Sequence, residues 1–178
     1  CKSFGNAAYI TKARVQLMRD MGAAPAPQNA FLLNLGLETL HLRMRAHSDN
    51  AKKIAEFLKN DKRVSWVNYP GLESSKDHEL AKKYLPNGSS GVISFGITGG
   101  RKTAIEFMDN LKVAAIVTHV ADARTCALHP ASTTHRQMTA EELKECGIGE
   151  DLIRFSVGIE NADDIIDDIK QALDKACN

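Results

Sequence analysis

The segment that most constrains the fold of this chain is Leu152–Glu160, near its C-terminal end. Ile153, Phe155 and Val157 alternate along it, which predicts a half-buried strand with these side chains on the core face. Arg154 then lies on the opposite face, where a long cation is costly to bury unless it meets an anion. A guanidinium on a rigid strand can bind a carboxylate through two parallel hydrogen bonds, or it can extend from a sheet edge into solvent.

A loop dense in hydroxyl groups, residues 129–135, precedes this strand. Ser132 is its first candidate for ligand binding, although a serine that follows Pro130 in a turn commonly bonds its own backbone. His129 and His135 offer nitrogen ligands, but no third ligand lies at metal-site spacing. We therefore expect no metal site and interpret both histidines as structural or as hydrogen-bond partners of the loop.

Charge and cysteine usage exclude several classes of function. The net charge of +1 provides no basic field for nucleic acid, and no stretch resembles a secretory signal or a membrane span. The four cysteines are widely scattered and form no Cys-x-x-Cys motif, so free thiols in a reducing compartment are expected. These observations predict a cytoplasmic protein that binds neither nucleic acid nor membrane.

Apolar periodicity, glycine and proline predict an alternation of helices and strands. We expect helices over residues 7–20, 28–59, 77–84 and 101–111, a short helix starting at Thr139, and a last helix capped by Asn161. Strands are expected over residues 64–69, 91–97 and 114–118, besides the Arg154 strand. The last helix carries a run of acidic residues that we interpret as a solvated face: Asp163, Asp164, Asp167 and Asp168. This order predicts an α+β fold, a small antiparallel or mixed sheet with helices packed on it.

The predicted helix over residues 28–59 changes character along its length. Its first half, residues 31–44, is apolar on several sides, which suits burial between two bodies. Its second half has a single apolar stripe, formed by Ala51, Ile54, Ala55 and Leu58. The pattern is typical of a connecting helix, so we expect residues 1–27 to end one domain with its linker and residues 28–178 to form a second, C-terminal domain.

Several motifs, in order along nearly the whole chain, resemble the Cys/Met-metabolism family of pyridoxal-phosphate (PLP) enzymes, and most closely its O-acetylhomoserine sulfhydrylases. The matching segments are Gly5–Ile10, Lys12–Leu17, Asn29–Leu33, Gly36–Leu40, Val67–Leu72, the loop at residues 129–135 and the Arg154 strand. The resemblance implies the small C-terminal domain of a fold-type I PLP enzyme. It also implies a cytoplasmic homo-oligomer, tetrameric in the family, that converts O-acetylhomoserine and sulfide to homocysteine and acetate.

The resemblance assigns two residues to the substrate. Arg154 matches the arginine of the family's Arg-x-Ser-Val-Gly motif, which holds the substrate α-carboxylate, and Ser132 matches a serine that lies beside the substrate and supports that arginine. The chain departs from the family at Ala121, where relatives often have glycine just before Asp122, and this puts the flexibility of the loop in doubt.

The resemblance also implies what this chain lacks. The family's cofactor lysine lies in a segment rich in serine and threonine that has no match here, and Lys12 matches a different segment. We therefore expect the lysine and the other cofactor ligands in an N-terminal PLP domain, which would precede Cys1 and act as this chain's partner. The isolated chain is then half a site, inactive and without covalently bound cofactor.

Three alternatives stay open. The chain could be a fragment of a cystathionine synthase or of a methionine or cystathionine lyase, since the residues that separate these enzymes lie mostly in the missing half. It could be a free-standing module that binds an amino acid through Arg154. Finally, it could be a structural or dimerising domain left by a decayed enzyme.

Overall fold

The computed structural model describes residues 2–177, which form two compact units that divide after Leu40, residues 2–40 and 41–177. In the first unit, η1 (Lys2–Ala7) leads into a helical run of α1 (Ala8–Thr11), the π-helical η2 (Lys12–Met18) and α2 (Arg19–Met21). Gly22 ends the run in a left-handed conformation with φ 67°, which only glycine adopts without strain. The predicted helix over residues 7–20 is therefore confirmed.

The predicted continuous helix over residues 28–59 is wrong, because the structure has two helices, α3 (Pro27–Glu38) and α4 (Leu40–Asn60). Thr39 lies between them with φ −108° and ψ 6°, outside the helical range, so the regular hydrogen-bond pattern stops there. None of the residues of α3 is buried. The predicted stripe on the second half is confirmed, since its four members on α4 are fully buried. The two units divide after Leu40, and the domain boundary expected between residues 27 and 28 stays a prediction.

The second unit is built on a mixed sheet of five strands in the order β1-β2-β5-β4-β3. The strands are β1 (Val64–Asn68), β2 (Val92–Ile97), β3 (Ala115–Ile116), β4 (Cys126–Leu128) and β5 (Leu152–Ser156). All neighbours pair antiparallel except β3 and β4, which are parallel. The α+β prediction is confirmed, but β4 was missed because three residues are too few to show alternation.

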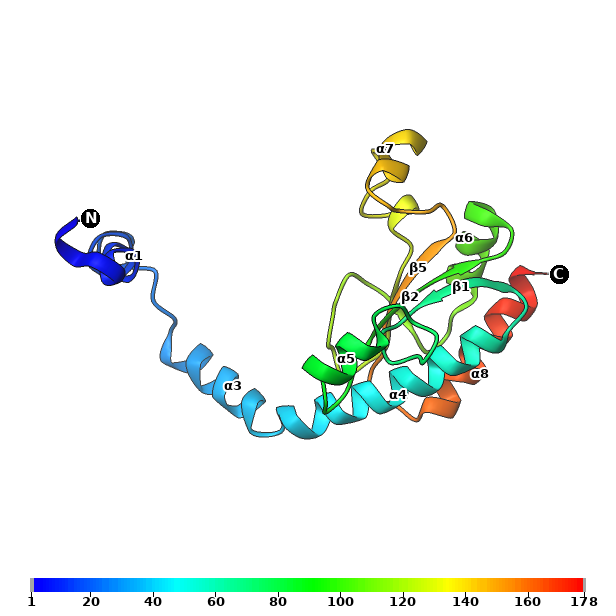
Figure 1. The fold of residues 1–178 in the computed structure, drawn as a ribbon, viewed down its shortest axis with the longest axis horizontal. Coiled ribbons are helices and arrows are strands. Elements are labelled where there is room, and N and C mark those ends of the chain that lie inside the picture. The colour runs from blue at the N-terminus through cyan, green and yellow to red at the C-terminus, as the bar shows by residue number, and fades with distance from the viewer. Residues whose placement is uncertain (1, 178) are drawn as a thin grey trace. The chain divides into compact units, whose positions relative to one another are not determined.

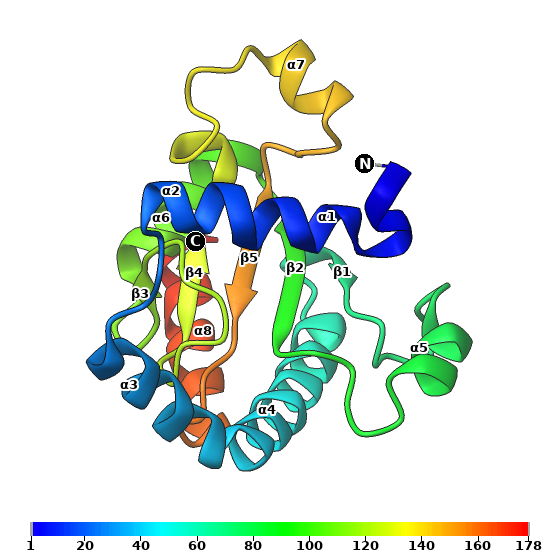
Figure 2. The ribbon, with the colours of Figure 1, turned by 90° about the vertical axis from the view of Figure 1, so that its left-hand side faces the viewer.

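Helices cover one face of this sheet: α4, α6 (Gly100–Asn110) and α8 (Ala162–Ala176) (Figures 1 and 2). The core contains Ile93, Phe95 and Ile97 of β2 together with Ile153 and Phe155 of β5, all of them 0% exposed. These are the odd-numbered positions of both strands, so the even-numbered side chains point to the opposite face. The predicted core face of the Arg154 strand is thus confirmed.

The shorter elements connect the sheet. They are α5 (His78–Tyr84), η3 (Pro130–Ser132) and α7 (Ala140–Glu145). Thr139 forms a capping box with Glu142 at the start of α7, and the Asn161 side chain accepts a hydrogen bond from the Asp163 N–H at the start of α8. Both caps agree with the sequence prediction. Among residues 2–177, no helix combines the length and the apolar character needed to cross a membrane.

The prediction of a solvated acidic face on α8 is wrong for Asp168, which is only 5% exposed. Its carboxylate accepts hydrogen bonds from the backbone N–H groups of Lys112, Val113 and Ala114 at 2.8, 2.9 and 3.1 Å. Asp168 therefore holds the connection between α6 and β3 against α8. Spacing along the helix could not distinguish it from its exposed neighbours Asp163, Asp164 and Asp167.

Candidate functional site

The candidate site lies on the face of the sheet opposite the helices. The register pairs Arg154 of β5 with Ser94 of β2 on one side and with Leu128 of β4 on the other. Residues that pair across antiparallel strands share a face, so these three side chains form a row across the centre of the sheet. The sequence prediction that Arg154 lies on the face away from the core is confirmed.

The Arg154 guanidinium is held at one end. Its Nη2 donates to the carbonyl oxygen of Thr118 at 2.8 Å, which fixes the direction of the planar group. Its Nε is buried, yet it has no hydrogen-bond partner among the described residues. A buried donor without a partner costs about 1–3 kcal/mol, so the described residues leave part of the hydrogen-bonding capacity of the guanidinium unfilled.

A cavity of about 430 Å³ lies beside this guanidinium. Its apolar lining comes from Val92, Leu128, Pro130, Ile148 and Leu152, and its polar lining from Ser94, Thr118, Thr134, His135 and Arg154. An apolar wall with a few convergent polar groups is the usual composition of a small-molecule site. A carboxylate at the guanidinium would leave the rest of a small amino acid against the apolar wall.

His129 stabilises the loop from inside. It is 1% exposed, its Nε2 lies 2.8 Å from the Glu150 carbonyl, and its Nδ1 lies 2.8 Å from Ser132 Oγ. A carbonyl only accepts, so Nε2 carries the proton and Nδ1 accepts from the serine hydroxyl in the neutral ring. Burial lowers the pKa of His129 below its usual 6.5, which favours this neutral form. The interpretation of His129 as a hydrogen-bond partner of the loop is confirmed.

The residues of this loop that line the cavity beside Arg154 differ from the one expected from the sequence. Ser132 does not line the cavity beside Arg154, because its hydroxyl is turned to His129. Thr134, which the sequence did not single out, and His135, which we interpreted as structural or as a hydrogen-bond partner, do line it, and Thr134 Oγ1 lies 2.9 Å from His135 Nδ1. Alternation along β2 could have indicated Ser94. Thr118 contributes through its backbone carbonyl and therefore gives no sequence signal.

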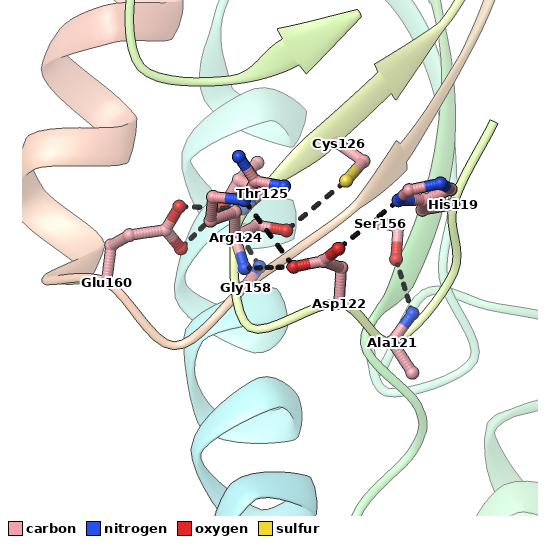
Figure 3. A network of polar contacts seen from close by, with 9 residues as sticks. All are labelled: His119, Ala121, Asp122, Arg124, Thr125, Cys126, Ser156, Gly158 and Glu160. Atoms are coloured by element: carbon pink, nitrogen blue, oxygen red, sulfur yellow. Dashed lines mark hydrogen bonds and ion pairs between the residues drawn. The ribbon is translucent and has the colours of Figure 1, made fainter. Parts of the chain in front are cut away.

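A second polar network lies in the loop between β3 and β4, residues 117–125 (Figure 3). His119, Asp122 and Cys126 bring one nitrogen, one oxygen and one sulfur atom within 4.8 Å of one another, a grouping not predicted from the sequence. The groups are already engaged: the backbone N–H of Arg124, followed by His119, lowers the pKa of the Asp122 carboxyl. The Cys126 thiol donates to the Arg124 carbonyl, and burial raises its pKa. We interpret the network as bracing of the loop, because a metal would require a thiolate.

The sequence of this chain is similar to those of known PLP-dependent enzymes. Residues 4–174 match the family of Cys/Met-metabolism PLP-dependent enzymes. The chain is 49% identical over 175 residues to homocysteine synthase of Schizosaccharomyces pombe and 47% identical over 169 residues to O-acetyl-L-homoserine sulfhydrylase of Leptospira meyeri. It covers 41% and 38% of these proteins, while they align with 98% and 94% of it. The chain thus spans about two fifths of the length of the relatives it matches.

Solved structures also match this chain over most of its length. The crystal structure of a putative O-acetylhomoserine (thiol)-lyase from Campylobacter jejuni, which contains a pyridoxyl-lysine phosphate, matches with a TM-score of 0.87 and 40% identity. The match covers 97% of this chain and 41% of that one. Cystathionine gamma-lyase from yeast matches with a TM-score of 0.85 and 40% identity over 91% of this chain and 42% of its own.

Proposed function

Because the chain belongs to the Cys/Met-metabolism family of PLP-dependent enzymes, we propose that it is the C-terminal portion of an O-acetylhomoserine sulfhydrylase-like enzyme. In this proposal residues 1–27 end the cofactor-binding domain and residues 28–178 form the small domain. The reaction replaces the acetate at Cγ of O-acetylhomoserine by sulfide and gives homocysteine. The similarity to a homocysteine synthase and to a sulfhydrylase supports this choice of reaction.

The observation that carries the proposal is the hydrogen bonding of the Arg154 guanidinium. Its Nη2 is fixed by the Thr118 carbonyl, while its buried Nε lacks a partner among the described residues beside a cavity of about 430 Å³. This geometry fits the α-carboxylate of an amino acid, which accepts charge-assisted hydrogen bonds from a guanidinium. Pyridoxal phosphate, when bound, withdraws electrons from the carbon atoms near the substrate amino group. Arg154 contributes orientation, since the direction of the carboxylate decides which bond to Cα lies perpendicular to the cofactor ring.

Ser132 has a supporting role in the proposal. Its proton is donated to His129, so its oxygen offers lone pairs to N–H donors such as a guanidinium or a substrate amino group. The His129 ring holds this rotamer because its own Nε2 is bonded to the Glu150 carbonyl. Because Ser132 does not line the cavity beside Arg154, its proposed support of the clamp passes through the loop that it braces with His129.

The cofactor lysine is proposed to lie outside residues 1–178, in the part of a longer polypeptide that the relatives also contain. Lys12, the one superficial candidate, is exposed in η2. We expect the isolated chain neither to bind the cofactor covalently nor to turn over. A pyridoxyl group found on any lysine of this chain after incubation with PLP and borohydride would contradict this expectation.

The test uses the full-length enzyme with its cofactor. Arg154→Lys keeps the positive charge but loses the planar pair of donors, so kcat/KM for O-acetylhomoserine should fall about 100-fold, or about 2.7 kcal/mol, with KM for sulfide unchanged. Arg124→Lys is the matched control, because the Arg124 side chain is 72% exposed and should leave kcat/KM within about twofold. Equal effects of the two substitutions would refute the assignment of the clamp to Arg154.

A lyase is the second candidate, supported by the structural match to cystathionine gamma-lyase. Product analysis separates the two. Homocysteine formed from O-acetylhomoserine and sulfide supports the sulfhydrylase, whereas cleavage of cystathionine without this synthesis supports the lyase. Titration calorimetry of the isolated chain with homoserine esters tests the alternative that the chain is a free-standing binding module. Micromolar binding would support that alternative, and no binding would count against it.

A further inference from the structure

The chain that follows Arg154 folds back onto the loop that holds Arg154. We call residues 117–125 the clamp loop, because the Thr118 carbonyl within it accepts the hydrogen bond from Arg154 Nη2. Residues 118–121, 123 and 124 of this loop are exposed, so the apolar core does not hold them. The position of the Thr118 carbonyl must therefore depend on polar anchors.

The anchors come from residues 156–160, which are the last residue of β5 and the segment that follows it (Figure 3). Ser156 Oγ accepts from the Ala121 N–H at 3.0 Å, and the Ile159 N–H donates to the Ala123 carbonyl at 2.9 Å. Ala121 adopts φ 60°, a left-handed conformation that costs a non-glycine residue about 1–2 kcal/mol and so needs a partner to persist.

Thr125 and Glu160 form the strongest anchor. The two carboxylate oxygens of Glu160 accept from the Thr125 N–H at 2.7 Å and from the Thr125 hydroxyl at 2.9 Å. The same hydroxyl accepts from the Gly158 N–H at 2.9 Å. Thr125 is 0% exposed, so each of these bonds is costly to break without replacement.

Gly158 shows how closely the two segments approach. A Cβ atom at this position would lie 2.5 Å from the Ala123 carbonyl oxygen and 2.5 Å from the Thr125 nitrogen. On the other side, Asn50 of α4 donates to the carbonyls of Gly158 and Glu160 at 3.1 and 2.8 Å. The segment is thus fixed between α4 and the clamp loop and has little freedom to shift.

From this geometry we propose that Thr125 and Glu160 are positioning residues for the carboxylate clamp. They act through the backbone of the clamp loop, which sets the place of the Thr118 carbonyl and with it the direction of the Arg154 guanidinium. The inference rests on the proposed function, since it assumes that Arg154 binds a substrate carboxylate. Neither residue lines the cavity beside Arg154, so neither is assigned a direct contact with the substrate.

The experiment compares two inhibitors on the full-length enzyme with its cofactor. Homoserine carries the α-carboxylate, and 3-amino-1-propanol is the same molecule without it. Thr125→Val keeps the shape but removes the hydroxyl, whereas Thr125→Ser keeps the hydroxyl and is the matched control. We expect Thr125→Val to raise the inhibition constant of homoserine at least tenfold and to leave that of 3-amino-1-propanol within twofold, with Thr125→Ser within threefold for both.

A double substitution tests whether the effect passes through Arg154. In an Arg154→Lys background, Thr125→Val should raise the inhibition constant of homoserine by less than a further twofold. Equal losses for both inhibitors, or a full additional loss in the double variant, would overturn the positioning role and leave the clamp intact. If Arg154→Lys alone does not raise the inhibition constant of homoserine, the assignment of the clamp to Arg154 is refuted, and this inference is refuted with it. Should Thr125→Val not fold, Glu160→Gln is judged by the same criteria.

Discussion

Asp168 offers the most direct test of the fold, because a single carboxylate there holds a connection between two elements. It accepts hydrogen bonds from three consecutive backbone N–H groups, at residues 112–114, and from the Gln171 side chain at 3.0 Å. Asp168→Ala removes the acceptor for all of them. The connection between α6 and β3 then loses its attachment to α8.

The cost can be worked out from these contacts. A hydrogen bond contributes about 1 kcal/mol net, and more when one partner is charged. The N–H groups of Lys112 and Val113 can turn to water, since both residues are exposed, whereas Ala114 is 6% exposed and its N–H would be left buried. We expect Asp168→Ala to lower the free energy of unfolding by about 3 kcal/mol, a large fraction of the stability of a typical domain.

The assay is urea unfolding followed by fluorescence of Trp66, the single tryptophan, which lies in β1 of the second unit. With a slope of about 2 kcal/mol per M, the midpoint should fall by about 1.5 M. Asp167→Ala is the control, because it makes the same exchange one residue away at an exposed position of α8, with the same gain in helix propensity. Coincident midpoints for the two variants would refute the reasoning.

Two further predictions concern the loops around the site. Ala121→Gly should raise the free energy of unfolding by about 1 kcal/mol, because Ala121 adopts φ 60° and glycine does so without strain; a loss of stability in the same urea assay would contradict this. Burial lowers the pKa of His129, so below about pH 6.5 the unfolded chain binds a proton that the folded chain resists. Stability should therefore fall as pH drops from 6.5, by up to about 1.4 kcal/mol per pH unit, and His129→Gln should flatten this part of the profile. An unchanged pH dependence in His129→Gln would show that His129 is not responsible.

Local sequence patterns were sufficient to predict much of the architecture. Alternation of Ile153, Phe155 and Val157 predicted both the core face of β5 and the open face with Arg154, because strand geometry alone places neighbouring side chains on opposite sides. The caps at Thr139 and Asn161 were likewise predictable, since an N-cap bonds to backbone two or three residues away. These features depend on contacts within a single element.

Tertiary structure decided the rest, because the deciding contacts join residues far apart in the chain. The buried role of Asp168 depends on backbone N–H groups more than fifty residues away, so its helix alone could not distinguish it from Asp167. The direction of the Arg154 guanidinium depends on the Thr118 carbonyl, a backbone group present in every residue and therefore without sequence signature. The sequence by itself determined which side chains could do the chemistry, and the packing of distant backbone decided where each one points.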